Sequence, residues 1–325
     1  MATIKPTIAF FTCSNGYGHF KRVIEVAAHL QQDFSIDIYC EKFQYDKFLP
    51  ILNVNFIFYK LSNIRWDVTV KSNKVDFDSY YNWVDYYGKD LDYYNYVISD
   101  NIVGLLEYRK DVILMGSFLW KDVFENKFGD NTLTKYDNDL LKKYKPTIIT
   151  NKYTETDSVI NYDNKVQFGF GCPHKQKVNY WEYYKTIVTV EPSLDYLTSY
   201  KECLDIVKST CSSLNEISSD ITTTNECIYV IRPGVGMLTH CVEHNIPIVA
   251  LYDPKDSSEI ITLAKLVEKL GIGIAHNTTN KQELVDGYFI AYKLNKFLSN
   301  RIYNKVELEK EGYENSAKYL RRLML

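Results

Sequence analysis

The sequence predicts an α/β protein built from two halves in series, each a parallel sheet covered by helices. Short apolar runs alternate with segments of helical spacing along most of the 325 residues, an alternation that is typical of parallel sheets. The length is also well above the ~100 to 200 residues of a common domain. A polar interval at 152–165, without an apolar period of its own, separates the two alternating sets.

The first set places strands and helices in regular succession. The expected strands are Thr7–Thr12, Ser35–Cys40, Asn55–Tyr59, Tyr96–Ser99, Val112–Gly116 and Thr147–Thr150. The expected helices are Phe20–Gln32, Asp78–Tyr94 and Ser117–Phe128. Tyrosine-rich though it is, the second of these helices is expected to face the core, because one set of its side chains recurs at i, i+3, i+4 and i+7. That set is Tyr80, Trp83, Val84, Tyr87 and Leu91.

The second set repeats the alternation and ends in a helix. Its expected strands lie at 186–192, 226–233 and 245–253, and its expected helices at Ser193–Ser209, Met237–Asn245, Ser258–Leu270 and Leu308–Leu325. We therefore expect a first domain at 1–155, a second at 156–300, and a carboxy-terminal helix within 301–325 that could pack back on the first domain.

Composition limits the classes of partner. With 46% hydrophobic residues, 24% charged residues and a net charge of −3, the chain can build a core but has no basic excess for nucleic acid. No run approaches the ~20 apolar residues of a membrane span, and residues 1–6 lack the apolar centre of a signal peptide. The seven cysteines form no C-x-x-C pair, which favours reduced thiols. We expect a cytoplasmic protein.

The stretch SNGYGHFKR, residues 14–22, lies between the first expected strand and the first expected helix. Gly16 and Gly18 would let the backbone approach a ligand, and free N–H groups of the helix would attract an anion. The third glycine of G-x-G-x-x-G is missing, which disfavours an NAD site. His19 is expected at the carboxyl edge of the sheet, partly exposed, where open α/β folds bind ligands. Its alternative role is to cap the helix.

A second glycine turn occurs in VIRPGVGMLTHCVEHNIPIVALYD, residues 230–253. The expected strand ends at Arg232-Pro233, and Gly234 and Gly236 open the next helix. The N–H groups of Gly236, Met237 and Leu238 would form another anion site. A purely connecting turn is the alternative.

The two stretches together resemble the GT-B glycosyltransferases, in particular the group containing the bacterial N-acetylglucosaminyltransferase of peptidoglycan precursor synthesis and the plant galactolipid synthases. Gly16-Tyr17-Gly18-His19 with Arg22 is similar to that group's G-x-G-H-x-x-R-like turn. Arg232-Pro233-Gly234-Val235-Gly236 with Thr239 is similar to its R-x-G-x-G-T-x-x-E-like element. Residues 95–101, 112–124 and 257–275 add similarity in matching order, so the resemblance covers most of the chain. It implies two Rossmann-like domains facing each other across a cleft.

The resemblance also implies an activity. A sugar would pass from a nucleotide-sugar donor, most simply a UDP-sugar, to a hydroxyl of a glycan or a lipid-linked acceptor, with inversion and without metal or another cofactor. His19 would be the base and Asp100 its partner, and Gly16, Tyr17, Gly18 and Arg22 would form the cleft turn. The donor-binding residues implied are Ser193, Arg232, Gly234, Gly236, Met237, Leu238, Thr239, His240 and Glu259. A peripheral position at the inner face of a membrane stays open.

One departure from the group's pattern keeps alternatives open. His240 follows Thr239 where the group has an acidic residue, so the carboxylate that binds the ribose is missing, unless Glu243 supplies it. A nucleotide-sugar hydrolase on the same fold is one alternative. A catalytically inactive binding or partner subunit is another.

Overall fold

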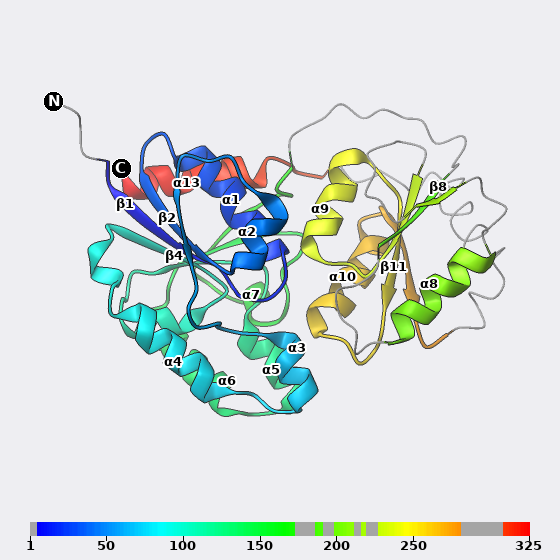
Figure 1. The fold of residues 1–325 in the computed structure, drawn as a ribbon, viewed down its shortest axis with the longest axis horizontal. Helices are drawn as coiled ribbons and strands as arrows, with labels where there is room; N and C mark the ends of the chain where they lie inside the picture. The colour runs from blue at the N-terminus through cyan, green and yellow to red at the C-terminus, as the bar shows by residue number, and fades with distance from the viewer. Residues whose placement is uncertain (1–4, 173–185, 191–197, 211–215, 219–226, 281–307) are drawn as a thin grey trace. The chain divides into compact units, whose positions relative to one another are not determined.

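The computed structural model describes residues 5–172, 186–190, 198–210, 216–218, 227–280 and 308–325. The chain divides into two compact units (Figure 1). Unit 1 comprises Met1–Gly171 together with Glu311–Leu325, and unit 2 comprises Cys172–Lys310.

Unit 1 contains a seven-stranded parallel sheet in the order β3-β2-β1-β4-β5-β6-β7. The strands are β1 Thr7–Phe11, β2 Ser35–Cys40, β3 Asn55–Phe58, β4 Tyr96–Asp100, β5 Ile113–Met115, β6 Ile148–Asn151 and β7 Lys165–Phe168. From β1 the chain first builds outward through β2 and β3, and then returns to add β4 on the other side of β1. The order therefore reverses between β1 and β4, the position where open α/β sheets bind ligands at their carboxyl ends.

Helices cover both faces of this sheet, with α1 and α13 on one face and α4 and α6 on the other (Figure 1). The helices are α1 Gly18–Leu30, α2 Lys42–Phe48, α3 Trp66–Ser72, α4 Phe77–Gly88, α5 Trp120–Phe128, α6 Thr132–Tyr144, α7 Asp157–Ile160 and α13 Gly312–Met324, with short 3-10 turns at Leu91–Tyr93 and Val103–Glu107. Because side chains alternate along a strand, Phe10 joins the core cluster with α1 and α13. Phe11 stacks on Tyr39 at 4.3 Å and meets Trp83 of α4 edge-on at 6.0 Å.

The last helix, α13, belongs to unit 1 although it follows unit 2 in the chain. Ala317, Leu320 and Met324 are buried in the same cluster as the inner face of α1. Arg321 adds an ion pair to Asp33, with 2.8 Å between Nε and Oδ2. The carboxy-terminal residues thus complete the core of the amino-terminal half.

The division of the chain falls after Gly171 rather than after residue 155. The polar interval that looked like a connection, 152–165, contains α7 and leads into β7, which pairs in parallel with β6 and places Thr150 beside Gln167. β7 is an edge strand whose residues are only partly buried. It therefore lacks the apolar run by which the inner strands are recognised.

The core role expected for the tyrosine-rich helix is confirmed, because its predicted inward residues are all buried. The helix α4 itself ends at Gly88, earlier than the expected end at Tyr94, and Leu91 packs from the 3-10 turn that follows.

Unit 2 contains a five-stranded parallel sheet in the order β12-β11-β10-β8-β9. Its strands are β8 Thr186–Val190, β9 Glu216–Ser218, β10 Cys227–Ile231, β11 Ile248–Tyr252 and β12 Gly273–Asn277, and its helices are α8 Thr198–Thr210, α9 Val235–His244 and α10 Ser258–Lys269. Tyr200 and Cys203 of α8 pack against Val230 and Val249 of the sheet. The order reverses between β8 and β10, so the turn after β10 lies at the switch point of this sheet.

Asp137 is one of the acidic side chains that are buried in unit 1. Asp137 of α6 is 0% exposed, and its Oδ1 accepts a hydrogen bond of 3.3 Å from the hydroxyl of Tyr80. Burial raises the pKa of Asp137 to about 8. The folded state thus holds this proton more tightly than the unfolded chain, whose aspartates titrate near 4. The resulting stabilisation is complete below about pH 4 and is lost as the pH rises towards about 8.

We expect Asp137→Asn to stabilise the protein relative to the wild type more at pH 8 than at pH 5, by about 1 to 3 kcal/mol. Asparagine keeps the shape and can accept the Tyr80 hydrogen bond, but it cannot ionise. Urea unfolding at the two pH values measures the difference, with the exposed Asp163→Asn as control. An unchanged pH dependence in Asp137→Asn would show that Asp137 does not cause it.

Candidate functional site

The turn between β1 and α1 holds the first candidate residues. Gly16 has a φ of +67°, a left-handed conformation that glycine adopts without strain. Tyr17 is the N-cap of α1, and the first intrahelical hydrogen bond runs from Lys21 N–H to Tyr17 O at 3.0 Å. The N–H groups of Gly18 and the two residues after it therefore lack acceptors within the helix. They lie at the positive end of the helix, at the switch point of the sheet.

His19, Asp100 and Arg22 meet at this switch point. His19 Nδ1 lies 2.7 Å from Asp100 Oδ1. Arg22 donates from Nε to Asp100 Oδ2 at 3.0 Å and from Nη2 to Oδ1 at 2.6 Å. His19 and Arg22 lie one turn apart on α1, while Asp100 ends β4. The structure therefore joins the predicted catalytic pair and adds Arg22 to it as a bidentate partner.

The charges in this cluster determine which nitrogen of the His19 imidazole carries the proton. Asp100 is 0% exposed, and although burial alone would raise its pKa, the positive Arg22 and the hydrogen bonds from His19 and Arg22 lower it. Asp100 is thus a carboxylate that accepts hydrogen bonds. In the neutral ring of His19 the proton consequently resides on Nδ1, which leaves the Nε2 lone pair available to act as a base.

The His19 side chain is buried, with 11% of its surface exposed, so the expectation of a partly exposed ring was wrong. Two aromatic side chains from the β5–α5 connection enclose it. The ring of Phe118 lies at 5.9 Å and that of Trp120 at 6.1 Å between centroids. The imidazole is thus held between Asp100 and two aromatic side chains.

The turn itself is held by two buried amides that sequence reasoning missed. Gln44 of α2 donates to the carbonyl oxygens of Cys13 and Gly16 at 2.9 and 2.7 Å. Asn63 accepts from Ser14 N–H at 2.6 Å. Buried amides with satisfied hydrogen bonds fix backbone position. No local pattern distinguishes these two residues from surface amides.

Asn101, next to Asp100, ties the end of β4 to the β5–α5 connection. It has a φ of +61°, and with its amide oriented to satisfy both groups, its nitrogen donates to Met115 O at 2.9 Å and Phe118 O at 3.1 Å. Gly116 leaves room for this amide, because a Cβ there would lie 1.3 Å from a terminal atom of the Asn101 side chain. The chain around Asp100 is thereby fixed from two sides.

In unit 2 the second glycine turn opens α9 at the sheet's switch point. Gly234 is an N-cap with extended backbone, and the first intrahelical bond runs from Leu238 N–H to Gly234 O at 3.0 Å. The N–H groups without an acceptor in the helix therefore belong to Val235, Gly236 and Met237. The expectation for Leu238 was wrong, since its N–H is used and its side chain is buried.

Other predicted donor residues of α9 and α10 have local partners. The Thr239 hydroxyl donates to Val235 O at 2.8 Å. The His240 ring contacts the rings of Tyr229 and His244 at 5.8 and 4.6 Å. Glu259 lies in the first turn of α10. Ser193 lies outside the described residues.

Arg232 is engaged in a buried ion pair. Its Nε and Nη2 donate to Asp256 at 2.7 and 2.9 Å, and the Asp256 side chain is 0% exposed. The hydroxyl of Tyr200 also donates to Asp256 Oδ2 at 2.7 Å, and Tyr200 in turn accepts from Asp253 N–H at 2.9 Å. Residues after β10 and β11 are thus joined to α8, a network that sequence reasoning missed.

Two kinds of feature are absent from the described residues. No helix in this part of the chain is both long and apolar enough to cross a membrane. No group of three or more His, Cys, Asp or Glu side chains there is arranged to hold a metal ion.

The two parallel sheets and the switch-point clusters define an α/β protein with the GT-B fold, as the sequence predicted. Solved glycosyltransferases of this fold match over nearly the whole chain. MurG of Acinetobacter baumannii matches with a TM-score of 0.63 at 11% identity, covering 98% of this chain and 99% of that one. SnogD of Streptomyces nogalater matches with 0.61 at 12% identity, covering 99% and 100%.

A plant enzyme extends the comparison. UGT89C1 of Arabidopsis thaliana, complexed with UDP-L-rhamnose, matches with a TM-score of 0.57 at 9% identity, covering 99% of this chain and 100% of that one. No protein-family model matches the sequence, and no curated protein sequence matches it. At these identities the likeness to solved structures establishes the fold.

Proposed function

We propose that the protein is a glycosyltransferase that moves a sugar from a UDP-sugar to an acceptor hydroxyl. The observation that supports this most is the cluster of His19, Asp100 and Arg22 at the switch point of unit 1. The fold shared with structures bound to UDP or a UDP-sugar supports the class of donor. Unit 1 would bind the acceptor and unit 2 the donor.

His19 is the base in this proposal. Its Nε2 takes the proton from the acceptor hydroxyl, whose oxygen forms a bond to the anomeric carbon. At the same time the bond from that carbon to the diphosphate oxygen breaks, and UDP leaves as an anion. Attack opposite to the leaving group inverts the anomeric centre. Asp100, kept anionic by Arg22, stabilises the imidazolium that forms.

The leaving diphosphate requires positive potential. The N–H groups of Val235, Gly236 and Met237 at the start of α9 supply it without a metal in this proposal. His240 would face the ribose or a phosphate and Glu259 the sugar, as the resemblance implies. The reaction class is transfer of a hexosyl group.

The donor site is tested by measuring UDP binding in the presence of EDTA. We expect UDP to raise the melting temperature without added metal. Val235→Pro should weaken UDP binding by about 1.5 to 3 kcal/mol, the range for hydrogen bonds to charged groups. Proline at the first helical position removes only an N–H that the helix does not use, and extended Gly234 accommodates it.

Val235→Ala, which keeps the N–H group, is the matched control and should bind UDP as the wild type does. Binding that appears only with a divalent cation would overturn the metal-free mechanism. A failure to bind any nucleoside diphosphate would point to an inactive subunit. Release of UDP from a nucleotide sugar at full rate without acceptor would identify a hydrolase.

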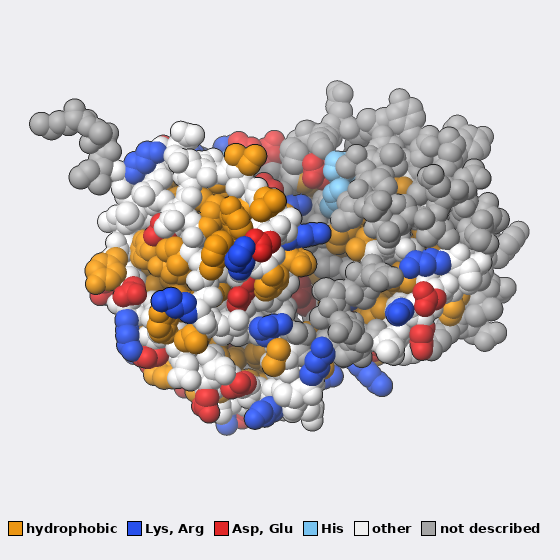
Figure 2. All heavy atoms as spheres, viewed as in Figure 1, with side chains coloured by type: hydrophobic (Ala, Val, Ile, Leu, Met, Phe, Trp, Pro, Cys, Tyr) orange, Lys and Arg blue, Asp and Glu red, His pale blue; other side chains and the backbone are white. Residues whose placement is uncertain are grey.

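Exposed apolar side chains over α2 support a peripheral contact with a lipid surface (Figure 2). Phe43, Leu49 and Ile51 are 41%, 63% and 100% exposed, and Lys42 and Lys47 lie beside them. At this surface the protein would encounter an apolar acceptor that is dissolved in the lipid or linked to it.

We expect Ile51→Asp to lower cosedimentation with phosphatidylglycerol vesicles, whereas the exposed Ile160→Asp should not. Equal sedimentation of the two variants would contradict this contact.

A further inference from the structure

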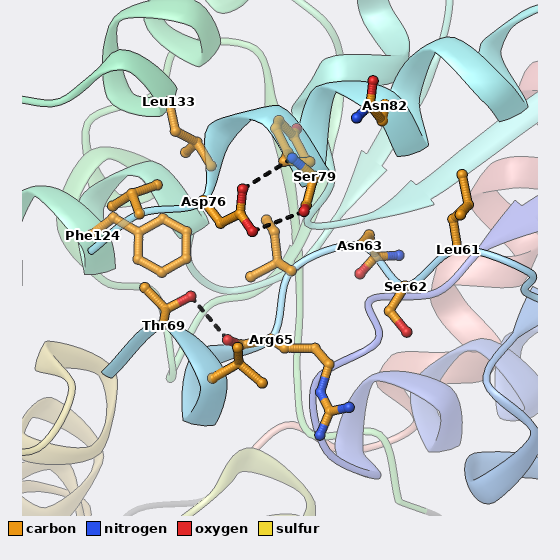
Figure 3. A pocket seen from close by; sticks show the side chains of 14 residues that line it. Leu61, Ser62, Asn63, Arg65, Thr69, Asp76, Ser79, Asn82, Phe124 and Leu133 are labelled. Carbon is orange, nitrogen blue, oxygen red and sulfur yellow. Dashed lines mark hydrogen bonds between the residues drawn. The ribbon is translucent and has the colours of Figure 1, made fainter. Parts of the chain in front are cut away.

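A cavity of about 360 Å³ lies in unit 1 next to the turn that carries His19 (Figure 3). Asn63 belongs both to the cavity lining and to the support of the turn, since its Nδ2 donates to Thr12 O at 3.0 Å. On the opposite wall the ring of Phe124 lies 5.7 Å from that of Trp120, which in turn lies 6.1 Å from the His19 ring. Phe124 of the lining is thus connected to the His19 ring through Trp120, which is not itself a lining residue.

The walls of the cavity are mainly apolar. Phe124 and Leu133 form one side (Figure 3). Ile64 and Val68, from the segment that follows β3, also line the cavity. Val68 lies at the rim, with 48% of its surface exposed. A cavity of this size and character matches the smaller sites that bind organic ligands in proteins.

Four polar side chains of the lining, those of Asn63, Thr69, Asp76 and Ser79, already have hydrogen-bond partners within the protein. Asp76 accepts from the backbone N–H and the hydroxyl of Ser79 at 3.1 and 2.8 Å. The Thr69 hydroxyl donates to Arg65 O at 2.9 Å, and the Arg65 guanidinium extends away from Asp76 (Figure 3). A sugar would need several of these groups as hydrogen-bond partners for its hydroxyls, and these groups would then lose the hydrogen bonds that they now make within the protein. An apolar ring needs no hydrogen bond from them.

We propose that this cavity binds the acceptor, as a neutral hydroxyl compound of one or two rings rather than a glycan chain, an inference that rests on the proposed function. Its apolar body fills the space between Phe124, Leu133 and Val68, and its hydroxyl is directed towards His19. The acceptor is thus recognised mainly by burial of apolar surface.

The probe for this site is 2-naphthol, a neutral two-ring hydroxyl compound, compared with N,N′-diacetylchitobiose as the glycan. Binding is measured by calorimetry with no donor present. Val68→Trp places a large ring at the rim, where the exposed position tolerates it. Ile160→Trp, at a position 51% exposed on α7 and outside the lining, is the matched control. Thermal melting verifies that both variants are folded.

We expect 2-naphthol to bind the wild type and Ile160→Trp equally and Val68→Trp at least about tenfold more weakly, a change of about 1.4 kcal/mol. Chitobiose should not bind measurably. Equal naphthol binding by Val68→Trp and the wild type would overturn the site. Tight chitobiose binding lost in Val68→Trp would overturn the class of acceptor.

The same samples separate this inference from the proposed function. If naphthol binds in the expected pattern but no nucleotide sugar donates to it, the transferase function fails, while the cavity remains a site for neutral apolar ligands. If a UDP-sugar is consumed by His19-dependent transfer in Val68→Trp as fast as in the wild type, the function stands and the cavity assignment fails.

Discussion

Replacing His19 with alanine is expected to lower turnover by about 10² to 10⁴, the range for loss of a general base. The protein should stay folded, because Asp100 keeps both hydrogen bonds from Arg22 at 3.0 and 2.6 Å and no buried charge is left uncompensated. Loss of the ring from its aromatic enclosure should cost about 1 kcal/mol, or a few degrees of melting temperature. Initial rates at saturating UDP-sugar and thermal melts measure the two effects.

His29→Ala is the matched control, since His29 is exposed on the same helix. It should keep full turnover. Full turnover in His19→Ala, or a large loss of stability with unchanged activity per folded molecule, would show that His19 supports the fold through its bond to Asp100 and takes no part in the reaction.

The second large effect is expected from Arg232→Ala, as a loss of stability of about 3 to 5 kcal/mol, the cost of leaving a buried charge without its partner. Burial alone would lower the pKa of Arg232, but the adjacent Asp256 raises it above its ordinary value. Without the guanidinium, the hydrogen bonds that Asp256 would keep with the described residues are those from the Tyr200 hydroxyl and the Ser257 N–H. Calorimetric unfolding of the wild type and the variant measures the loss.

Arg321→Ala provides the control for this prediction. The pair of Arg321 and Asp33 has nearly the same Nε to Oδ2 distance, 2.8 Å, but both side chains are 37% exposed. Exposed pairs contribute about 0 to 1 kcal/mol, so this variant should be nearly as stable as the wild type. An Arg232→Ala variant of normal stability but about 1 to 3 kcal/mol weaker UDP binding would instead place Arg232 at the diphosphate, as the resemblance implies.

The fold could be predicted from the sequence wherever a strand carries a clear apolar pattern. The continuous apolar run of β1 marks an inner strand of a parallel sheet, and β1 ends one residue earlier than predicted. β2, whose buried residues alternate, has the predicted bounds, and the edge strand β3 ends one residue earlier than predicted. Strands with weak signals were missed. β7 is a partly buried edge, and β12 begins with Gly273, where a Cβ would lie 2.0 Å from Ile248 O. Glycine occurs at this position because two backbone segments approach each other closely, and the pattern of apolar residues along the sequence cannot reveal such an approach.

The candidate site could be predicted only in part. His19 follows from its turn and Asp100 from its place at a strand end. The bond from Arg22 to Asp100 depends on β4 lying beside β1, a fact of sheet order that local patterns do not encode. The same holds for Asp256 and Arg232, which meet because β10 and β11 are neighbours. Pairings between distant segments therefore required the structure.

The return of α13 to unit 1 has a consequence for biosynthesis. During translation, residues 1–171 leave the ribosome long before residues 312–324, and until then the apolar surface that Ala317, Leu320 and Met324 will cover stays open to water. The core of the nascent amino-terminal half therefore remains incomplete until residues 172–310 have been synthesised. Nonsense mutations or proteolysis near the end of the chain would consequently harm the half that was synthesised first.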